Sequence, residues 1–543
     1  MEYLVTAAAV LLAWGCAHFG SNILSGSILI AAGILLYRLY YKRSGRLTDP
    51  AALFSIAWIG GMGISAWKLS RLQTDWELLT WICLAAAWFS FALGSRLAER
   101  HAEQRQTKEP HTGQRHAEAR YAGLQQTVRQ GGGWRERNWQ AAGQQCIEKC
   151  AEQYAVPEKT SSDACSRTAG RIFNSMLLLT AVSFACFFFE AWRLRYVPLF
   201  ISDTPHAYSY FHVSGVHYFT VSCVLVPSCL VLYLEMLKRH IACLHAENAG
   251  LSGKALFWKL CALGYGGRMA GALFCTALAL LIPILCVSRF QLIFAVLLAV
   301  LTKAMLMGTK TARKRVLRAA LLFFACMVPV YIGLTVARAH DVAYLNGIFE
   351  MKDPRTPIFF TQPYMYIANN FDNLNCLIRD LPQSGHTLGL RMLFPLWALT
   401  GLKFLFPGLV SFPLYVTKTE LTTVTLFYDA YYDFGVAGVL ALGLLLGAVS
   451  RMLFDAICHR TGAGQAGKNG KREKKAQDGV AQAVLPALCG RGAALILIYA
   501  QLAFYLLFSF FTTWFSNPTT WFYLALSVLF YVYLAGGEKE RSV

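Results

Sequence analysis

Long apolar runs alternate with short polar stretches along most of the chain. The runs are about 20 residues each, and a helix of that length crosses a hydrocarbon core of roughly 30 Å. The pattern predicts an all-α polytopic membrane protein with about 12 transmembrane helices. The predicted spans are residues 3–18, 22–41, 50–68, 76–96, 171–191, 214–236, 270–287, 290–309, 317–338, 435–454, 491–513 and 519–537.

Positively charged clusters give these spans an orientation. Lys and Arg gather after every second span, and therefore on one side of the membrane; examples are Lys42, Arg43 and Arg46, then Lys310, Arg313, Lys314 and Arg315. That side is expected to be the cytoplasm, where short loops carry an excess of Lys and Arg. The alternation requires an even number of spans and predicts that both termini are cytoplasmic. It also accounts for the net charge of +20 without a nucleic acid partner.

Composition agrees with a membrane protein. The chain is 56% hydrophobic and only 15% charged, whereas soluble domains are about 25% charged. Its 16 cysteines lack the spacing of metal ligands. Cys146 and Cys150 are four residues apart and could bind a metal ion or form a redox pair. The favoured interpretation is that the cysteines are reduced, packed residues. No metal site and no cofactor are expected, because no nucleotide-binding glycine loop, paired-aspartate metal motif or Ser-His-Asp spacing appears.

The spans fall into three groups separated by polar segments. The N-terminal helices occupy residues 1–96, the central helices 171–338 and the C-terminal helices 435–543. Residues 97–170 are rich in Arg, Glu, Gln and Gly and are expected to form a mobile cytosolic loop. Residues 455–490, within the last group, read as a cytosolic linker because they are rich in Gly and Lys.

Residues 339–434 form the largest outward-facing segment, and they combine aromatic, proline and apolar residues. This extracytoplasmic loop is therefore expected to fold and pack. Within it, residues 388–412 are long and apolar enough to span, but they carry Arg391, Lys403, Pro395 and Pro407, and Pro413 follows directly. A crossing there would also break the alternation of charge. The segment is predicted to be a re-entrant or interfacial helix.

A few cations lie on the outward side, against the charge rule. Arg193 and Arg195 end the fifth span, Arg289 lies in a tight turn after the seventh, and Arg338 ends the ninth. A guanidinium fork matches phosphate oxygens and cannot lose its charge, so several arginines on one face suit a pyrophosphate. The alternative is that they reach lipid headgroups, which is favoured for Arg193.

Histidine and tyrosine side chains provide further candidates on this side. His217 lies at the mouth of a span, where it is either a general base or a structural hydrogen-bonding residue. Tyr364, Tyr366 and Arg379 belong to the mixture of aromatic and polar side chains that grips sugars. The alternative is a packed cap in which the tyrosines are core residues.

The loop ends in a dense junction, Tyr428-Asp429-Ala-Tyr431-Tyr432-Asp433-Phe-Gly435, which runs directly into a span. Carboxylates at a membrane surface are costly unless they have a use. Asp429 and Asp433 are four residues apart and would share a helical face. Either carboxylate would deprotonate a sugar hydroxyl or pair with an outward arginine, and pairing is favoured for one of them.

This junction, continued to Gly438, resembles the oligosaccharide repeat-unit polymerases (Wzy-type, O-antigen polymerase-like). The segments Asp49-Pro50 to Trp58, Val-Pro198-Leu-Phe and Ser288-Arg289-Phe-Gln add to the resemblance, which extends over most of residues 45–455. It implies a GT-C-like membrane glycosyltransferase of the bacterial cytoplasmic (inner) membrane. Such an enzyme joins undecaprenyl-pyrophosphate-linked repeat units on the outer face, in O-antigen, capsule or exopolysaccharide synthesis.

The resemblance also implies partners and roles. Expected partners are the lipid-linked donor and acceptor, membrane lipids, a chain-length regulator and a flippase. Arg289 and Arg338 would stabilise the pyrophosphate leaving group, and His217 or Asp433 would act on the acceptor hydroxyl. Substrate-binding roles are expected for Arg195, Tyr364, Tyr366, Arg379, Tyr428, Asp429 and Tyr432. An O-antigen ligase and a lipid-linked oligosaccharide flippase or other transporter remain alternatives; charges at span ends rather than mid-span favour surface chemistry.

Overall fold

The computed structural model describes residues 1–108, 158–201, 207–247, 264–306, 318, 322, 347–382, 385–460 and 490–539. These residues form helices and connecting turns, and within them the only strand-like pairing is an isolated bridge between Ser70 and Met351. Among the described residues, eight helices are long and apolar enough to cross a membrane, which confirms the predicted multi-pass membrane protein. They are α2 (Asn22–Ser44), α4 (Leu78–Lys108), α7 (Glu158–Leu194), α10 (Val226–Glu247) with the preceding α9 (Val216–Val221), α12 (Tyr265–Leu285), α13 (Arg289–Leu306), α19 (Tyr428–Arg460) and α22 (Pro518–Lys539).

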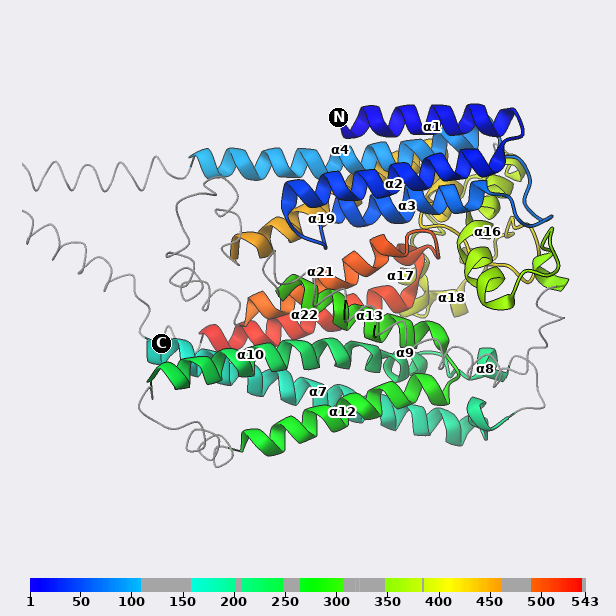
Figure 1. The fold of residues 1–543 in the computed structure, drawn as a ribbon. Coiled ribbons are helices and arrows are strands. Elements are labelled where there is room, and N and C mark those ends of the chain that lie inside the picture. The colour runs from blue at the N-terminus through cyan, green and yellow to red at the C-terminus, as the bar shows by residue number, and fades with distance from the viewer. Residues whose placement is uncertain are drawn as a thin grey trace, which may run out of the picture.

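Three shorter apolar helices lie alongside them, namely α1 (Glu2–His18), α3 (Pro50–Ala66) and α21 (Arg491–Leu507) (Figure 1). The remaining predicted span, 317–338, lies outside the described residues apart from two positions. The helices form three neighbouring groups in Figure 1: α1 to α4 with α19, then α13 with α21 and α22, then α7 with α10 and α12.

The bundle has two distinct ends. Helix α1 runs from the N-terminus toward one end, and α22 runs from that same end back toward the C-terminus (Figure 1). We call the end toward which α1 runs the α16 end, because α16 (Ile358–Asp380), α17 (Phe394–Leu399) and α18 (Leu402–Leu405) gather there. The opposite end is the termini end.

Helices α4 and α19 are held unusually close. A Cβ atom on Gly447 of α19 would lie only 2.0 Å from the carbonyl oxygen of Phe91 in α4. Any larger residue would push the backbones apart, so this contact depends on glycine, as in small-residue helix packing within membranes. Because α19 continues from the outer loop, the contact fixes where that loop enters the bundle.

An ion cluster joins the same helices at the termini end. Arg451 of α19 lies 3.5 Å from Asp49, 2.9 Å from Glu99 and 2.9 Å from Asp455. Asp49 is also the N-cap of α3, since it accepts the backbone N–H groups of Ala51 and Ala52. The cluster therefore ties α3, α4 and α19 together where they leave the apolar region.

Two polar segments differ from their predicted bounds. Helix α4 continues to Lys108 and α7 begins at Glu158, so both edges of the 97–170 segment are helical. Arg, Glu, Gln, Lys and Ala are good helix formers, and an established helix extends into such sequence at little cost. Residues 109–157, with Cys146 and Cys150, lie outside the described residues. Helix α19 runs to Arg460, so the 455–490 segment also begins as helix, and residues 461–489 lie outside the described residues.

The outer loop packs through the polar face of α16. Buried Asp372 accepts hydrogen bonds from Lys68 Nζ at 2.6 Å, Trp76 Nε1 at 2.8 Å and Gln73 Nε2 at 2.7 Å. Buried Asn373 donates to the carbonyls of Leu421 and Thr423. These bonds fix two distant chain segments onto one helix.

The segment predicted as a re-entrant or interfacial helix, 388–412, is broken into α17, α18 and the short 3-10 turn η4 (Pro407–Leu409). Pro395 lies in the first turn of α17 and Pro407 begins η4, because proline fits the first helical turn and not its interior. The segment stays at the α16 end and does not run through the bundle (Figure 1).

Candidate functional site

The aromatic and acidic junction is a short helix bent against a long one. Within α19, Gly435 has φ 59° and ψ −145°, which breaks the helix between Phe434 and Val436. Only glycine adopts such angles readily, so the bend depends on it. The Tyr432 carbonyl, close to the break, lies 3.0 Å from Nδ1 of His386. The junction thus meets residues 385–393 of the outer loop.

Asp433 fastens this loop to α19. Its buried carboxylate accepts the backbone N–H groups of Arg391 at 3.2 Å and Met392 at 2.8 Å, and also the hydroxyl of Thr387. A catalytic role is predicted for Asp433. In the structure its oxygens are bonded to protein donors, and the role that these bonds support is anchoring.

Asp429 pairs with an arginine, but not with one of the outward arginines predicted from the charge pattern. Its Oδ1 accepts from Nε of Arg391 at 2.7 Å. The guanidinium carbon also lies 4.5 Å from the centre of the Tyr432 ring. Burial alone would lower the pKa of Arg391, but the Asp429 carboxylate outweighs burial and raises it, so the side chain stays charged. In the sequence, the feature that points to Arg391 as a functional residue is its position as a charged residue within an apolar, proline-rich segment.

Most of the tyrosines predicted to frame sugars are interior. Tyr428 donates its hydroxyl to the Tyr415 carbonyl at 2.8 Å, and Tyr364 donates to Gln73 Oε1 at 2.6 Å. Burial raises the pKa of the Tyr364 hydroxyl, which therefore stays neutral. Tyr432 is buried beneath Arg391. Tyr366 is the one of the four that keeps part of its surface exposed.

Arg289 is the first residue of α13, and it is 6% exposed. Its Nη1 donates to Gln362 Oε1 of α16 at 3.3 Å. The neighbouring Phe290 stacks on Phe511 with ring centres 4.7 Å apart, and Phe511 lies 6.0 Å from the ring of Tyr366. The α13 turn, α16 and the α21–α22 connection therefore meet around this arginine. A guanidinium keeps its charge when buried and its planar fork matches the oxygens of an anion such as a phosphate.

His217 is oriented by a buried carboxylate that the sequence reasoning missed. Its Nδ1 lies 3.2 Å from both carboxylate oxygens of Glu190, in α7. Glu190 also accepts from Thr220 Oγ1 at 2.8 Å and from the Val213 N–H at 2.9 Å. The imidazole side chain is 30% exposed, so Nε2 is left on its open edge. The signal was an acidic residue inside the apolar sequence Phe-Phe-Phe-Glu190-Ala-Trp.

The other predicted residues lie apart from these groups. Arg195 is exposed at the end of α7 with φ 67°. Arg379 is exposed and pairs with its neighbour Asp380 at 2.7 Å, which raises the pKa of that arginine. Arg338 lies outside the described residues.

Three groups therefore gather at the α16 end: the Arg289 junction, the His217–Glu190 pair and the Arg391–Asp429 pair. The described ranges contain no cluster of three His, Cys, Asp or Glu side chains suited to a metal ion.

Comparison with known proteins gives no information on the roles of these residues. No protein-family model, no curated protein and no solved structure matches the chain.

Proposed function

We propose that the chain is a GT-C-like membrane glycosyltransferase with 12 spans and cytoplasmic termini. It polymerises undecaprenyl-pyrophosphate-linked oligosaccharide repeat units on the outer face of the bacterial cytoplasmic membrane. One observation carries the proposal: a buried arginine, Arg289, and a carboxylate-oriented histidine, His217, lie at the same end of an apolar bundle.

The two groups suit the two halves of glycosyl transfer. The bond from the donor sugar C1 to the pyrophosphate oxygen breaks, and Arg289 stabilises the negative charge that develops on that oxygen. The acceptor hydroxyl oxygen bonds to C1, and its proton passes to Nε2 of His217. Glu190 then stabilises the resulting imidazolium, as a buried carboxylate does for a general base. Arg338 is proposed to assist Arg289.

The aromatic side chains beside Arg289 supply a surface for sugars. Phe290, Phe511 and Tyr366 are part-exposed and lie in ring contact with one another. Their flat faces would stack on sugar C–H groups next to the reacting bond. The Tyr428–Asp433 junction instead holds Arg391 and the outer loop in place, so it acts as a wall of the site.

The test is reconstitution of the purified full-length chain in liposomes with lipid-pyrophosphate repeat units. The proposal expects a ladder of products that differ by one repeat. A single transfer onto an acceptor that is not lipid-linked would identify a ligase instead. No product above the starting unit, with folded protein and a competent donor, would overturn the proposal.

A further inference from the structure

The outer loop exposes an unusual amount of apolar surface on one side. We call residues 385–409 the wedge; they include α17, α18 and η4. Seven large apolar side chains of the wedge are between 43% and 78% exposed. They are Leu388, Leu393, Leu396, Leu399, Phe404, Leu405 and Phe406. So many exposed apolar side chains in one short segment mark an interaction site in a folded protein.

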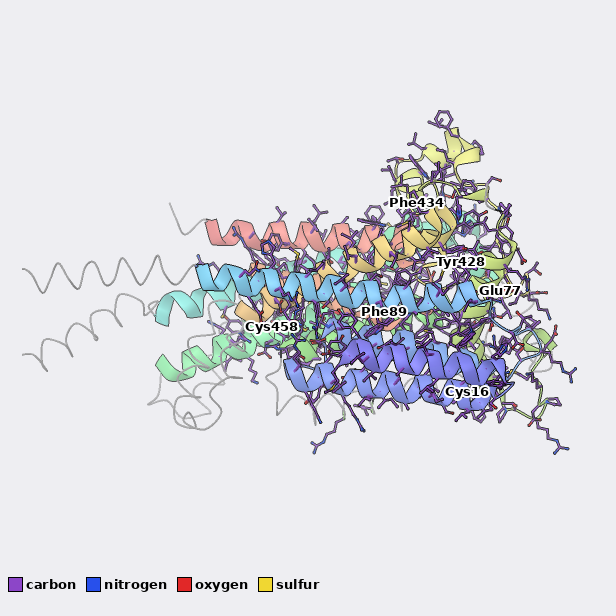
Figure 2. All side chains as sticks on the ribbon, turned by 90° about the horizontal axis from the view of Figure 1, so that it is seen from above. Cys16, Glu77, Phe89, Tyr428, Phe434 and Cys458 are labelled. Atoms are coloured by element: carbon purple, nitrogen blue, oxygen red, sulfur yellow. The ribbon has the colours of Figure 1, made fainter. Side chains whose placement is uncertain are left out.

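The position of the wedge indicates what covers this surface. Figure 2 shows it projecting sideways from the bundle beside Phe434, in the first part of α19. Phe434 is itself 45% exposed and begins an exposed apolar row on α19 that continues through Leu440 and Leu444. Helix α17 also packs against α22, whose exposed face carries Trp521 and Leu529. The wedge is thus continuous with the lipid-facing surfaces of two spanning helices, and the occupant that fits is the bilayer.

Where the wedge meets α19, it presents a prepared anion-binding group, Arg391. Arg391 is fixed at Nε by Asp429 and lies over the Tyr432 ring. Its side chain is 16% exposed. Among the residues that the structure describes, neither Nη1 nor Nη2 has a hydrogen-bond acceptor. Two parallel N–H groups on a fixed plane match two oxygens of one phosphate.

We propose that Arg391 binds the phosphate of a bilayer phospholipid whose acyl chains lie along the wedge. The charge of the site selects this ligand. Asp429 neutralises Arg391, so the pair carries no net charge before a ligand arrives. A phosphodiester with a single negative charge is therefore accommodated more easily than a pyrophosphate with several. The site is separate from Arg289, and the inference does not depend on the glycosyltransferase proposal.

Native mass spectrometry of the full-length chain, titrated with phosphatidylglycerol, tests the site. Wild type is expected to hold one lipid more tightly than the rest. Arg391→Lys keeps the ion pair and loses the fork, and it should weaken that binding at least about tenfold. Arg355→Gln removes an exposed arginine from the same end and should leave binding unchanged. Equal binding by wild type and Arg391→Lys would overturn the proposal.

Two further arms separate the possible ligands. Phosphatidylglycerol is expected to remain bound when inorganic pyrophosphate or undecaprenyl pyrophosphate is added in equal amount. Displacement by undecaprenyl pyrophosphate alone would show that the site takes the substrate lipid and not a phospholipid. If Arg391→Lys fails to fold, a photo-reactive residue at Leu405 in liposomes gives an independent result. Lipid adducts at that position support the wedge, and their absence contradicts it.

Discussion

Two ion pairs at the α16 end, the buried Lys68–Asp372 pair and the part-buried Arg391–Asp429 pair, show how similar contacts serve different purposes. In the Lys68–Asp372 pair, both carboxylate oxygens accept from protein donors, and Lys68 also donates to the Thr74 carbonyl. In the Arg391–Asp429 pair, Nε is the only guanidinium nitrogen that donates a hydrogen bond among the described residues, and Nη1 and Nη2 remain open. A buried pair with every polar atom satisfied is a structural joint. One with unused donors at its surface is a binding group.

Removing Lys68, the cation of the Lys68–Asp372 pair, should have the largest effect on stability. Lys68→Ala leaves the Asp372 carboxylate buried without its counter-ion, at a cost of about 3–5 kcal/mol. Thermal unfolding of the purified protein in detergent measures this loss. Arg355→Ala, an exposed arginine at the same end, is the control and should unfold like wild type. A Lys68→Ala protein as stable as wild type would remove the distinction between the two pairs.

A substitution at Asp433 tests whether the Arg391–Asp429 pair depends on the hydrogen bonds by which Asp433 anchors the outer loop. Asp433→Asn replaces one acceptor oxygen by an NH2 group that faces backbone N–H donors, and should cost about 1–3 kcal/mol. Hydrogen exchange of residues 385–393 should become faster, while exchange in α16 stays slow. Unchanged exchange in the loop would show that Asp433 does not anchor Arg391.

The bend in α19 at Gly435 supports the Arg391–Asp429 pair, and changing it should have the next largest effect on stability. Gly435→Ala forces a residue with a Cβ into φ 59°, at a cost of about 1–2 kcal/mol. Because Asp429 precedes the bend, the phosphatidylglycerol bound through Arg391 should also be held less tightly. The matched control is Gly408→Ala on the wedge, where a Cβ meets no neighbouring atom. Equal stability of both variants would argue against strain at the bend.

The smallest effect is expected at Arg391 itself. Arg391→Lys preserves a positive partner for Asp429, so stability should fall by only about 1 kcal/mol. The same melting assay compares it with Lys68→Ala. A loss as large as that of Lys68→Ala would place Arg391 among the structural joints and not among the binding groups.

The apolar runs predicted most of the fold. For α2 the predicted span, 22–41, matches a helix from Asn22 to Ser44, because twenty apolar residues leave little choice of structure. The start of α19 could not be predicted. The apolar run predicts a span that begins at Gly435, whereas the helix begins at Tyr428 and bends at that glycine. The bend depends on contacts with the outer loop, which no local pattern encodes.

The candidate site was only partly readable from sequence. Arg289 and His217 stand out because they are polar residues at span ends. Their partners Gln362 and Glu190 come from other helices, and the folded topology alone brings them together. Arg391 and Asp429 are 38 residues apart in sequence, and their pairing follows from the path of the wedge. Whether a tyrosine is core or surface likewise depends on distant acceptors, as for Tyr364 and Gln73.

The most direct test of the proposed function compares two arginine variants in the reconstituted ladder assay. Arg289→Ala removes the buried cation proposed to stabilise the leaving group, while Arg355→Ala removes an exposed arginine at the same end. Both proteins should be folded and present in equal amount. The account predicts that Arg289→Ala gives no ladder and that Arg355→Ala gives the wild-type ladder. A wild-type ladder from Arg289→Ala would contradict the account.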